Sequence, residues 1–166
     1  MVLSDVFGAY THGMSQDTDM RLPGRDEIAR LLERHGIQPT TQRIDIARVL
    51  FGRHQHLCAE DVLQRVTAAG ARVSKATVYN TLGLFARKGL VREVIVEPGR
   101  VFYDPNTRPH HHFYNVDTGE LIDVPASECA FEQLPSPPEG TTTESVDVII
   151  RIRNAAGWGG MERLPE

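Results

Sequence analysis

The sequence predicts an α+β protein, in which an N-terminal winged helix-turn-helix domain precedes a small α/β domain. Two observations carry this prediction. From Arg25 to about Lys88 apolar residues recur at helical spacing, whereas from Val91 onward they alternate with polar residues, as in a half-buried strand. Three or four short helices followed by a tight hairpin are the arrangement of a winged helix-turn-helix.

The helices expected in the first half are bounded by residues that favour the start or the end of a helix. Thr40 or Thr41 can cap the second helix and Ser74 the fourth, because their hydroxyl groups accept hydrogen bonds from free backbone N–H groups. Gly36 and Gly89 follow the first and the fourth helix, where glycine commonly ends a helix. The expected helices cover residues 25–35, 41–52, 59–69 and 74–88, with the core positions Ile28, Leu31, Leu32, Ile44, Ala47, Leu50, Phe51, Val62, Leu63, Val66, Val78, Leu82 and Phe85.

The second half carries short strand patterns. A hairpin is expected first, in which Val91–Val96 and Val101–Tyr103 flank a turn at residues 97–99. Further strands are expected at residues 110–116, 120–124 and 145–153, and a short helix near 126–133.

Composition argues against a membrane protein and a cysteine-based site, and it favours a protein that binds a polyanion. No apolar run approaches the roughly 18 residues that span a bilayer, and the N-terminus lacks a signal-peptide pattern, so a cytoplasmic protein without a membrane partner is expected. Cys58 and Cys129 are too far apart in sequence for a disulfide framework or a CxxC zinc site. Residues 21–100 carry fourteen Lys and Arg against eight Asp and Glu, whereas residues 101–166 carry four against eleven, which suggests that the basic part meets a polyanion.

A tract of three histidines at residues 110–112 is the first candidate site. Alone such a tract is usually solvated, but on a strand its first and third members point to the same face. A hairpin with a two- or four-residue loop brings Asp123 to that face, and Asp104 and His56 are further candidates from earlier segments. Imidazole and carboxylate without thiolate suit Fe(II), Mn(II) or Zn(II).

If His56 shares an ion with the other four residues, the metal joins the helical half to the β half. Occupancy then sets the angle between them, because a ligand that binds one arrangement better shifts the population towards it. A metalloenzyme or a metal-storage protein would use the same cluster, but no motif supplies the open coordination position and nearby base that catalysis requires. We therefore expect no enzyme.

Three segments resemble the ferric uptake regulator family: QPTTQR at residues 38–43, HLCAED at 56–61 and VSKATVYNTL at 73–82, of which ATVYNTL is highly specific. The similarity continues through residues 89–91 and the Tyr103-Asp104, histidine-tract and Asp123 series, and it covers about residues 25–153. Within the family the chain looks most like the iron response regulator branch, on the motifs LFG at 50–52, FYD at 102–104, HHHFY at 110–114 and PEG at 138–140.

The resemblance implies a transcriptional regulator that binds DNA as a homodimer or a higher oligomer. Its β halves pair, and each winged helix binds one half of an A/T-rich inverted repeat. We thus expect a flexible leader at residues 1–24, a DNA-binding domain at 25–104, a dimerisation and metal-sensing domain at 105–154 and a flexible tail at 155–166. On matching positions the implied metal ligands are His56, Asp104, His110, His112 and Asp123; Tyr79 and Asn80 would meet base edges, and Arg43 and Lys75 would hold phosphates.

The chain departs from the family pattern where many members carry CxxC for structural zinc. Asn115 and Thr118 stand there, so no structural zinc is expected and the β half should hold together by packing alone. His111 leaves a second metal or haem site open, although Pro109 replaces a ligand-type residue found in some relatives.

The signal also stays open. Iron or manganese occupancy is one alternative, with zinc binding in vitro. Peroxide is the other, through irreversible oxidation of His56 or His110 by bound Fe(II), and Asp123 resembles the peroxide-sensing branch in being Asp rather than Glu.

Overall fold

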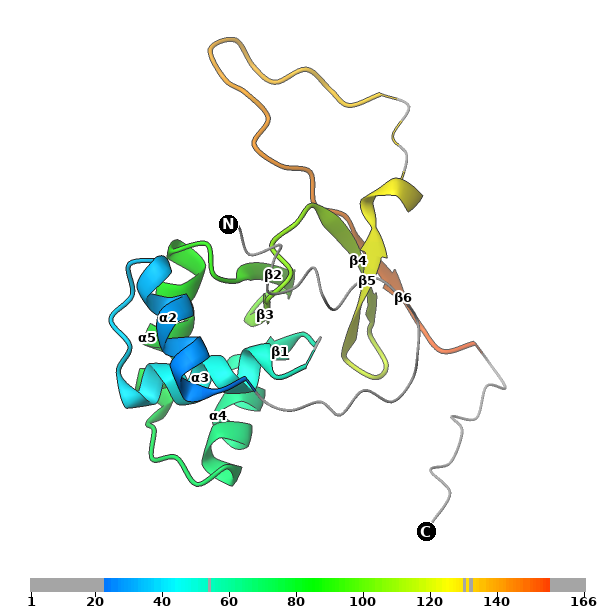
Figure 1. The fold of residues 1–166 in the computed structure, drawn as a ribbon. Helices are drawn as coiled ribbons and strands as arrows, with labels where there is room; N and C mark the ends of the chain where they lie inside the picture. The colour runs from blue at the N-terminus through cyan, green and yellow to red at the C-terminus, as the bar shows by residue number, and fades with distance from the viewer. Residues whose placement is uncertain (1–22, 54, 130, 132, 156–166) are drawn as a thin grey trace.

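A computed structural model of the chain describes residues 23–53, 55–129, 131 and 133–155 (Figure 1). The expected leader, apart from Pro23 and Gly24, and the expected tail, apart from residue 155, lie outside the described residues. The elements are α2 (Arg25–Arg34), α3 (Thr41–Phe51), β1 (Leu57–Cys58), α4 (Ala59–Ala68), α5 (Lys75–Arg87), β2 (Arg92–Glu97), β3 (Arg100–Asp104), β4 (His110–Asn115), β5 (Glu120–Pro125), η1 (Ala126–Glu128) and β6 (Ile149–Ile152).

The helix boundaries follow from the expected capping residues. The Thr40 side chain accepts a hydrogen bond from the backbone N of Arg43, and the Ser74 side chain accepts one from Thr77. Gly36 and Gly89 follow α2 and α5 with φ angles of 65° and 67°, in the left-handed region that glycine adopts without strain.

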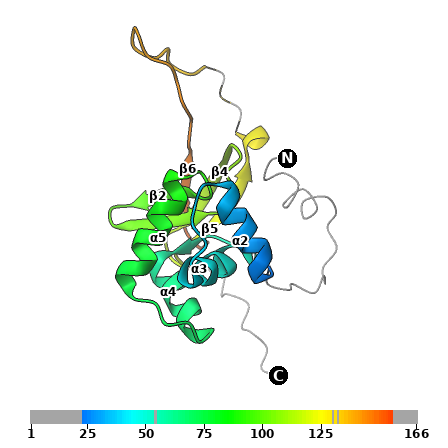
Figure 2. The same ribbon diagram turned by 60° about the vertical axis from the view of Figure 1, so that its left-hand side comes forward.

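The four helices pack around one core beside the sheet β1-β3-β2 (Figures 1 and 2). Most expected core positions are buried, including Leu32, Leu50 and Phe85. Phe51 and Leu63 are exceptions, because they lie at the margin of this core and are only partly buried. The helical half is therefore built as predicted.

Strand β1 was not predicted. Its two residues pair with the wing strand β3, so that Leu57 is opposite Tyr103 and Cys58 is opposite Phe102. Two residues are too few to show the alternating pattern of a strand. In the sequence they look like the segment that leads into the next helix. The pairing brings His56, just before β1, beside Asp104 at the end of β3.

The second sheet has the order β5-β4-β6. Strands β4 and β5 form the expected antiparallel hairpin, with Asn115 opposite Glu120 across a four-residue turn. Strand β6 pairs with β4 in parallel and is shorter than the expected 145–153. Just before β6, the backbone N–H of Val148 donates to the His111 ring 3.3 Å away, and the Val148 carbonyl accepts from the backbone N of His112 at 3.0 Å.

The helix expected near residues 126–133 is a single 3-10 turn, Ala126–Glu128, and residues 130 and 132 of that prediction lie outside the described part. Residues 133–145 project away from both sheets (Figure 1).

Polar contacts supplement packing in the β half. Asp117, in the β4–β5 turn, accepts hydrogen bonds from the Arg153 guanidinium and the backbone N of Asn154, both at 2.9 Å. The Asn115 amide also donates to the Asn154 side chain, and its carbonyl oxygen accepts from the backbone N of Asp117 and of Thr118. We call Asn115, Asp117, Arg153 and Asn154 the turn clamp, and it ties the turn to the end of β6.

A second core lies between the two sheets. Val94, Val96 and Phe102 of the wing pack against Tyr114 and Leu121 of the second sheet. The Arg151 guanidinium reinforces this contact by donating to the Val96 carbonyl at 2.5 Å. The wing thus rests on the same strands that carry the histidine tract.

Candidate metal centre

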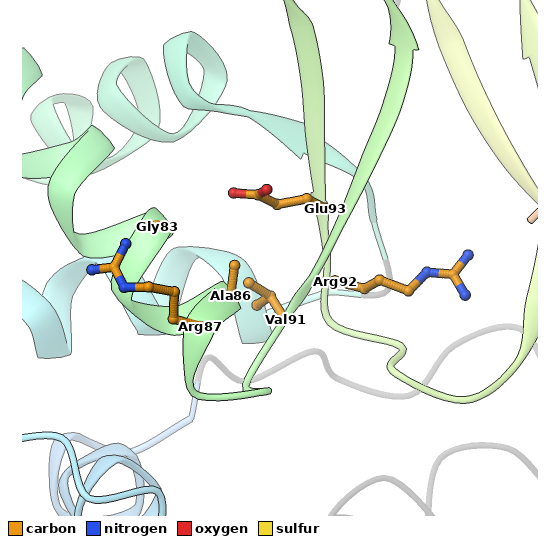
Figure 3. A pocket seen from close by; sticks show the side chains of 6 residues that line it. All are labelled: Gly83, Ala86, Arg87, Val91, Arg92 and Glu93. Carbon is orange, nitrogen blue, oxygen red and sulfur yellow. The ribbon is translucent and has the colours of Figure 1, made fainter. Parts of the chain in front are cut away.

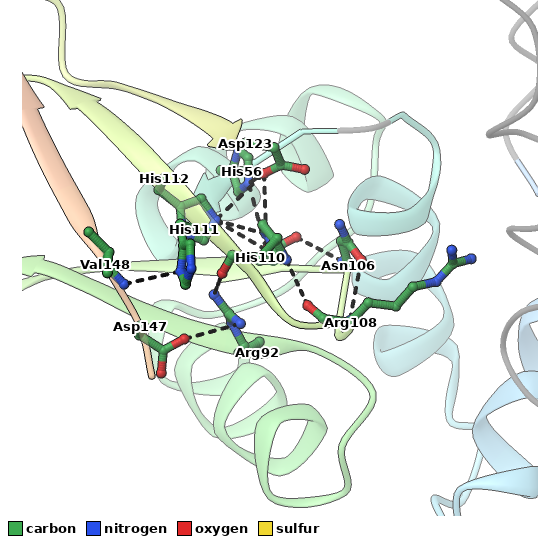
Figure 4. A network of polar contacts seen from close by, with 11 residues as sticks. His56, Arg92, Asn106, Arg108, His110, His111, His112, Asp123, Asp147 and Val148 are labelled. Atoms are coloured by element: carbon green, nitrogen blue, oxygen red, sulfur yellow. Dashed lines mark hydrogen bonds and ion pairs between the residues drawn. The ribbon is translucent and has the colours of Figure 1, made fainter. Parts of the chain in front are cut away.

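Five side chains converge where the two sheets meet. His56, Asp104, His110, His112 and Asp123 each offer one ligand atom, and these atoms all lie within 4.8 Å of one another. The shortest separations are 2.7 Å between His56 Nε2 and Asp123 Oδ1 and 2.8 Å between His110 Nε2 and Asp104 Oδ2. Figure 4 shows His56, His110, His112 and Asp123 lying close together.

Each of the five positions is fixed by an element of the fold. Asp104 ends β3, and His56 lies beside it through the β1 pairing. His110 and His112 lie two residues apart on β4 and therefore face the same side of the sheet. Asp123 is directly opposite His112 in the β4–β5 register, as the hairpin argument predicted.

Neighbouring groups orient two of these side chains. The Nδ1 atom of His110 lies 2.7 Å from the Arg108 carbonyl and donates to it, which leaves the Nε2 lone pair facing the cluster. The Oδ1 atom of Asp104 accepts from the backbone N of Asn106 at 2.8 Å, which leaves Oδ2 facing the cluster. Both contacts are of the kind that orients metal ligands in proteins.

The electrostatics of the cluster favour protons or a cation at its centre. Burial alone would lower the pKa of His56 and of His110, but hydrogen bonds to Asp104 and Asp123 outweigh it and raise these values to about 9 and about 10. Burial would raise the pKa of Asp104, yet hydrogen bonds from His110, His112 and His56 hold it well below its usual range. The two carboxylates therefore create a strong demand for positive charge.

The donor set fits a divalent metal ion. Bonds of about 2.0–2.2 Å place donors on opposite sides of one ion roughly 4.0–4.4 Å apart, which is close to the spread of this cluster. Three imidazole nitrogens and two carboxylate oxygens suit Fe(II), Mn(II) and Zn(II). His112 and Asp104 are each only 1% exposed, so the centre is shielded from water.

His111 faces away from this cluster, on the opposite side of β4. It is buried, its Nδ1 accepts from Val148, and its ring meets the Phe131 ring edge-on at 5.8 Å between centroids. Among the described residues His111 belongs to no group of three or more metal-type side chains.

Arg92 is a supporting residue that the sequence did not reveal. From the start of β2 it donates to the His110 carbonyl at 3.1 Å and pairs with Asp147 at 3.2 Å, as Figure 4 shows. It thereby links the wing, the histidine strand and the segment before β6. No motif could have indicated this, because the two partners depend on the tertiary fold.

The expected DNA-contacting residues lie on the helical half. Tyr79 is 41% exposed on α5, and Lys75 and Asn80 are exposed beside it, whereas Val78, Leu82 and Phe85 of the same helix are buried. Arg43 lies on α3, and its guanidinium donates to the Gln38 carbonyl at 2.9 Å. Tyr79 thus points away from the core, as groove contact requires.

A separate hollow of about 440 Å³ lies between the end of α5 and the start of β2 (Figure 3). Arg87 and Arg92 flank it with their guanidinium groups pointing in opposite directions, and Glu93 adds one carboxylate. Its charged groups do not converge on one point, so no ligand is assigned to it.

Comparison with known proteins settles the family. The model of the ferric uptake regulator family matches residues 34–150. The chain belongs to this family. A peroxide-responsive repressor of Staphylococcus epidermidis is 31% identical over 98 residues, which are 59% of this chain and 65% of that protein. The match thus spans slightly less than two thirds of the length of that repressor.

Solved structures agree on the fold. The ferric uptake regulator of Pseudomonas aeruginosa with manganese is 26% identical, has a TM-score of 0.58, and the match covers 75% of this chain and 96% of that one. The ferric uptake regulator of Vibrio cholerae, 22% identical with a TM-score of 0.62 over 76% and 98% of the two chains, supports the fold alone. The predicted fold and family are confirmed, while the iron response regulator branch stays a prediction. None of the described helices has the length and apolar character needed to cross a membrane.

Proposed function

We propose that this protein is a metal-responsive, sequence-specific transcriptional regulator, a DNA-binding repressor rather than an enzyme. The observation that carries the proposal is the origin of the five clustered side chains. His56 and Asp104 belong to the winged-helix half, whereas His110, His112 and Asp123 belong to the second sheet. A ligand held by all five fixes one half against the other.

The mechanism follows from the charges of the cluster. A divalent ion bound there supplies positive charge at a point that five donors reach together. Asp104 and Asp123 would hold the positive charge from opposite halves, and His56 and His110 would release their protons on becoming ligands. His56 Nε2 and His110 Nε2 each lie within ion-pair distance of both carboxylates, so either histidine can join the two halves when it is protonated. Because these residues come from both halves, an ion held by all five would favour one angle between the winged helix and the second sheet.

DNA recognition is assigned to the exposed face of α5. Tyr79 and Asn80 would meet base edges in the major groove, while Lys75 and Arg43 would hold phosphates. The helix N-terminus adds its positive dipole on the same side as Lys75. In a dimer, the angle set by the metal determines whether two such helices match the half-sites of an inverted repeat.

The outer face of the second sheet supports a homodimer. Phe113 has Ile122 on one side and Ile150 on the other in the strand register, and Ile122 and Ile150 are 43% and 36% exposed. Neighbouring exposed apolar side chains on one sheet face are typical of an interface. Ile122→Asp should dissociate the dimer in analytical ultracentrifugation, or the higher oligomer if pairs assemble further. An unchanged mass would contradict this interface.

Iron or manganese is the proposed physiological metal, with zinc binding in vitro. This assignment rests on the oxygen and nitrogen donors and on the named relatives, which include a ferric uptake regulator with manganese. Peroxide sensing is the second candidate, because relatives in Staphylococcus epidermidis and Staphylococcus aureus that are 31% and 32% identical are peroxide-responsive repressors. A second metal or haem at His111 stays a prediction, and binding there would have to displace the contact with Val148.

The test combines metal analysis with DNA binding. Duplexes selected from a random pool would be titrated with protein in the presence of chelator, Fe(II), Mn(II), Zn(II) or haem. The proposal expects affinity to change with one of the first two metals, and indifference to every addition would overturn it. Mass spectrometry after dilute peroxide separates the second candidate, which requires added oxygen on a peptide containing His56 or His110.

A further inference from the structure

Two of the expected DNA-contacting side chains already share a partner inside the protein. The Tyr79 hydroxyl donates to Oε1 of Glu60 at 2.5 Å, and Lys75 Nζ lies 3.2 Å from the same oxygen. Lys75 Nζ is also 5.5 Å from the centroid of the Tyr79 ring, so the three side chains form one group. Glu60 comes from the first turn of α4, and the other two come from α5.

The protonation behaviour of this group agrees with the geometry. The hydrogen bond to Glu60 raises the pKa of Tyr79 to about 12, while the same bond and the nearby Lys75 lower the pKa of Glu60. Glu60 is therefore a carboxylate, and Tyr79 a hydroxyl donor, at any physiological pH.

We propose that Glu60 is a specificity-determining residue, whose carboxylate occupies Tyr79 and Lys75 in the free protein and must be displaced by DNA. The inference rests on the proposed DNA-binding function of α5. When DNA binds, a phosphate replaces the Glu60 oxygen as the partner of Lys75. A hydrogen-bond acceptor on a base replaces the same oxygen as the partner of Tyr79. That oxygen then loses two partners beside a polyanion, which repels it.

This competition acts unequally on different DNA sequences. Random DNA offers phosphates everywhere, so it replaces the partner of Lys75 but leaves Tyr79 without a matched acceptor. A recognised site replaces both partners. The cost of displacing Glu60 is therefore fully recovered only on the correct sequence, and Glu60 widens the ratio of specific to random binding.

The position of Glu60 is well defined although its side chain is exposed. The next residue, Asp61, accepts a hydrogen bond from the backbone N of Cys58 at 3.1 Å, which fixes the first turn of α4 against β1. That anchoring directs the Glu60 carboxylate across to α5. A freely rotating carboxylate would not compete efficiently with DNA, because it would seldom occupy the contact.

The experiment compares Glu60→Gln with Glu33→Gln, which removes the same charge from an exposed position on α2 that lacks these contacts. Each full-length protein would be titrated, under the metal condition that supports binding, against a duplex selected by the wild type and a random duplex of equal length. Surface pairs of this kind change affinities by roughly two- to fivefold. E60Q should gain about that factor on random DNA and less on the selected duplex, so its specificity ratio falls.

Salt dependence gives an independent readout. In the wild type, Glu60 takes up a cation when Lys75 leaves it, which offsets one ion released from DNA. The slope of log affinity against log salt should therefore be about one unit steeper in E60Q. Lys75→Ala should flatten the slope by about one unit in the E60Q background and by less in the wild type.

Several outcomes overturn the inference. Equal binding by E60Q and E33Q, or equal gains in both, leaves no role for the Glu60 contact. If the wild type binds no selected duplex, or if Tyr79→Ala has no effect on binding, the proposed function itself has failed. Thermal melting checks the fold of E60Q. Glu60→Asp, which keeps the charge at the helix start but withdraws the carboxylate by one methylene, should shift random binding in the same direction.

Discussion

The Nε2 atoms of His110 and His112 lie 3.0 Å apart, although both rings come from the same strand. Two imidazole nitrogens at this distance can share at most one proton, so one lone pair always faces the other ring. A cation that lies near both nitrogens gives each lone pair a partner. The carboxylates of Asp104 and Asp123 complete the same centre from two other strands.

Removing one ligand should abolish the metal response while the fold persists. His112→Ala is expected to lower metal affinity by more than roughly 100-fold, since even changes outside the ligand shell cost 10–100-fold. Competition titration with a metal indicator measures this loss. His35→Ala is the matched control, because His35 ends α2 and lies outside the cluster. Unfolding of H112A, seen by circular dichroism, would show that the cluster is structural.

The metal-free protein should lose stability as the pH rises above about 6.5. Folding raises the pKa of His56 from 6.5 to about 9 and that of His110 from 6.5 to about 10. The two protonated histidines therefore stabilise the fold fully below pH 6.5, and this stabilisation is lost as the pH rises through about 9 and 10. The lowered pKa of Asp104 adds stability that is lost as the pH falls below about 4. Urea unfolding with chelator at several pH values tests this window.

Metal binding should release protons near neutral pH for the same reason. His56 and His110 are protonated in the metal-free protein at pH 7.5 and must be neutral as ligands, so about two protons should leave for each metal ion. A pH indicator in weakly buffered solution reports this number. Binding without proton release would place the metal elsewhere.

Tyr79→Ala should reduce discrimination between DNA sequences. The ring and hydroxyl are exposed on α5, and each lost base contact is expected to cost about 1–3 kcal/mol on the selected duplex. Binding to random DNA should change far less, because phosphate contacts remain. Equal weakening on both duplexes would indicate that Tyr79 holds the backbone instead.

The turn clamp should contribute measurably to the stability of the second sheet. Asp117→Ala removes the contacts with Arg153 and Asn154 and should lower the free energy of unfolding by about 1 kcal/mol. Glu120→Ala, at an exposed neighbouring position on β5, serves as the control in urea unfolding. Equal effects of both substitutions would show that these contacts add nothing.

The helices and hairpins were predictable because their signals are local. Thr40 and Ser74 cap helices through their own hydroxyl groups, and the β4–β5 register follows from one short turn. Strand β1 and the parallel partner of β4 were not predictable. Leu57–Cys58 is too short to carry a period, and the choice between parallel and antiparallel pairing of β6 depends on where the preceding loop leads.

The site was predictable to the extent that strand geometry determines it. His110, His112 and Asp123 share one face by alternation and register alone, whereas placing His56 there required the family resemblance. The contacts of Arg92 with His110 and of Glu60 with Tyr79 join elements by tertiary packing, and no local pattern encodes them.

The parallel pairing of β6 with β4 has a consequence for biosynthesis. The winged helix draws its core from residues 28–103, which leave the ribosome early. Strand β4 lacks one neighbour until Ile149–Ile152 has been translated, some forty residues after the histidines. A nascent chain can therefore complete the winged-helix core before strand β4 gains its parallel neighbour.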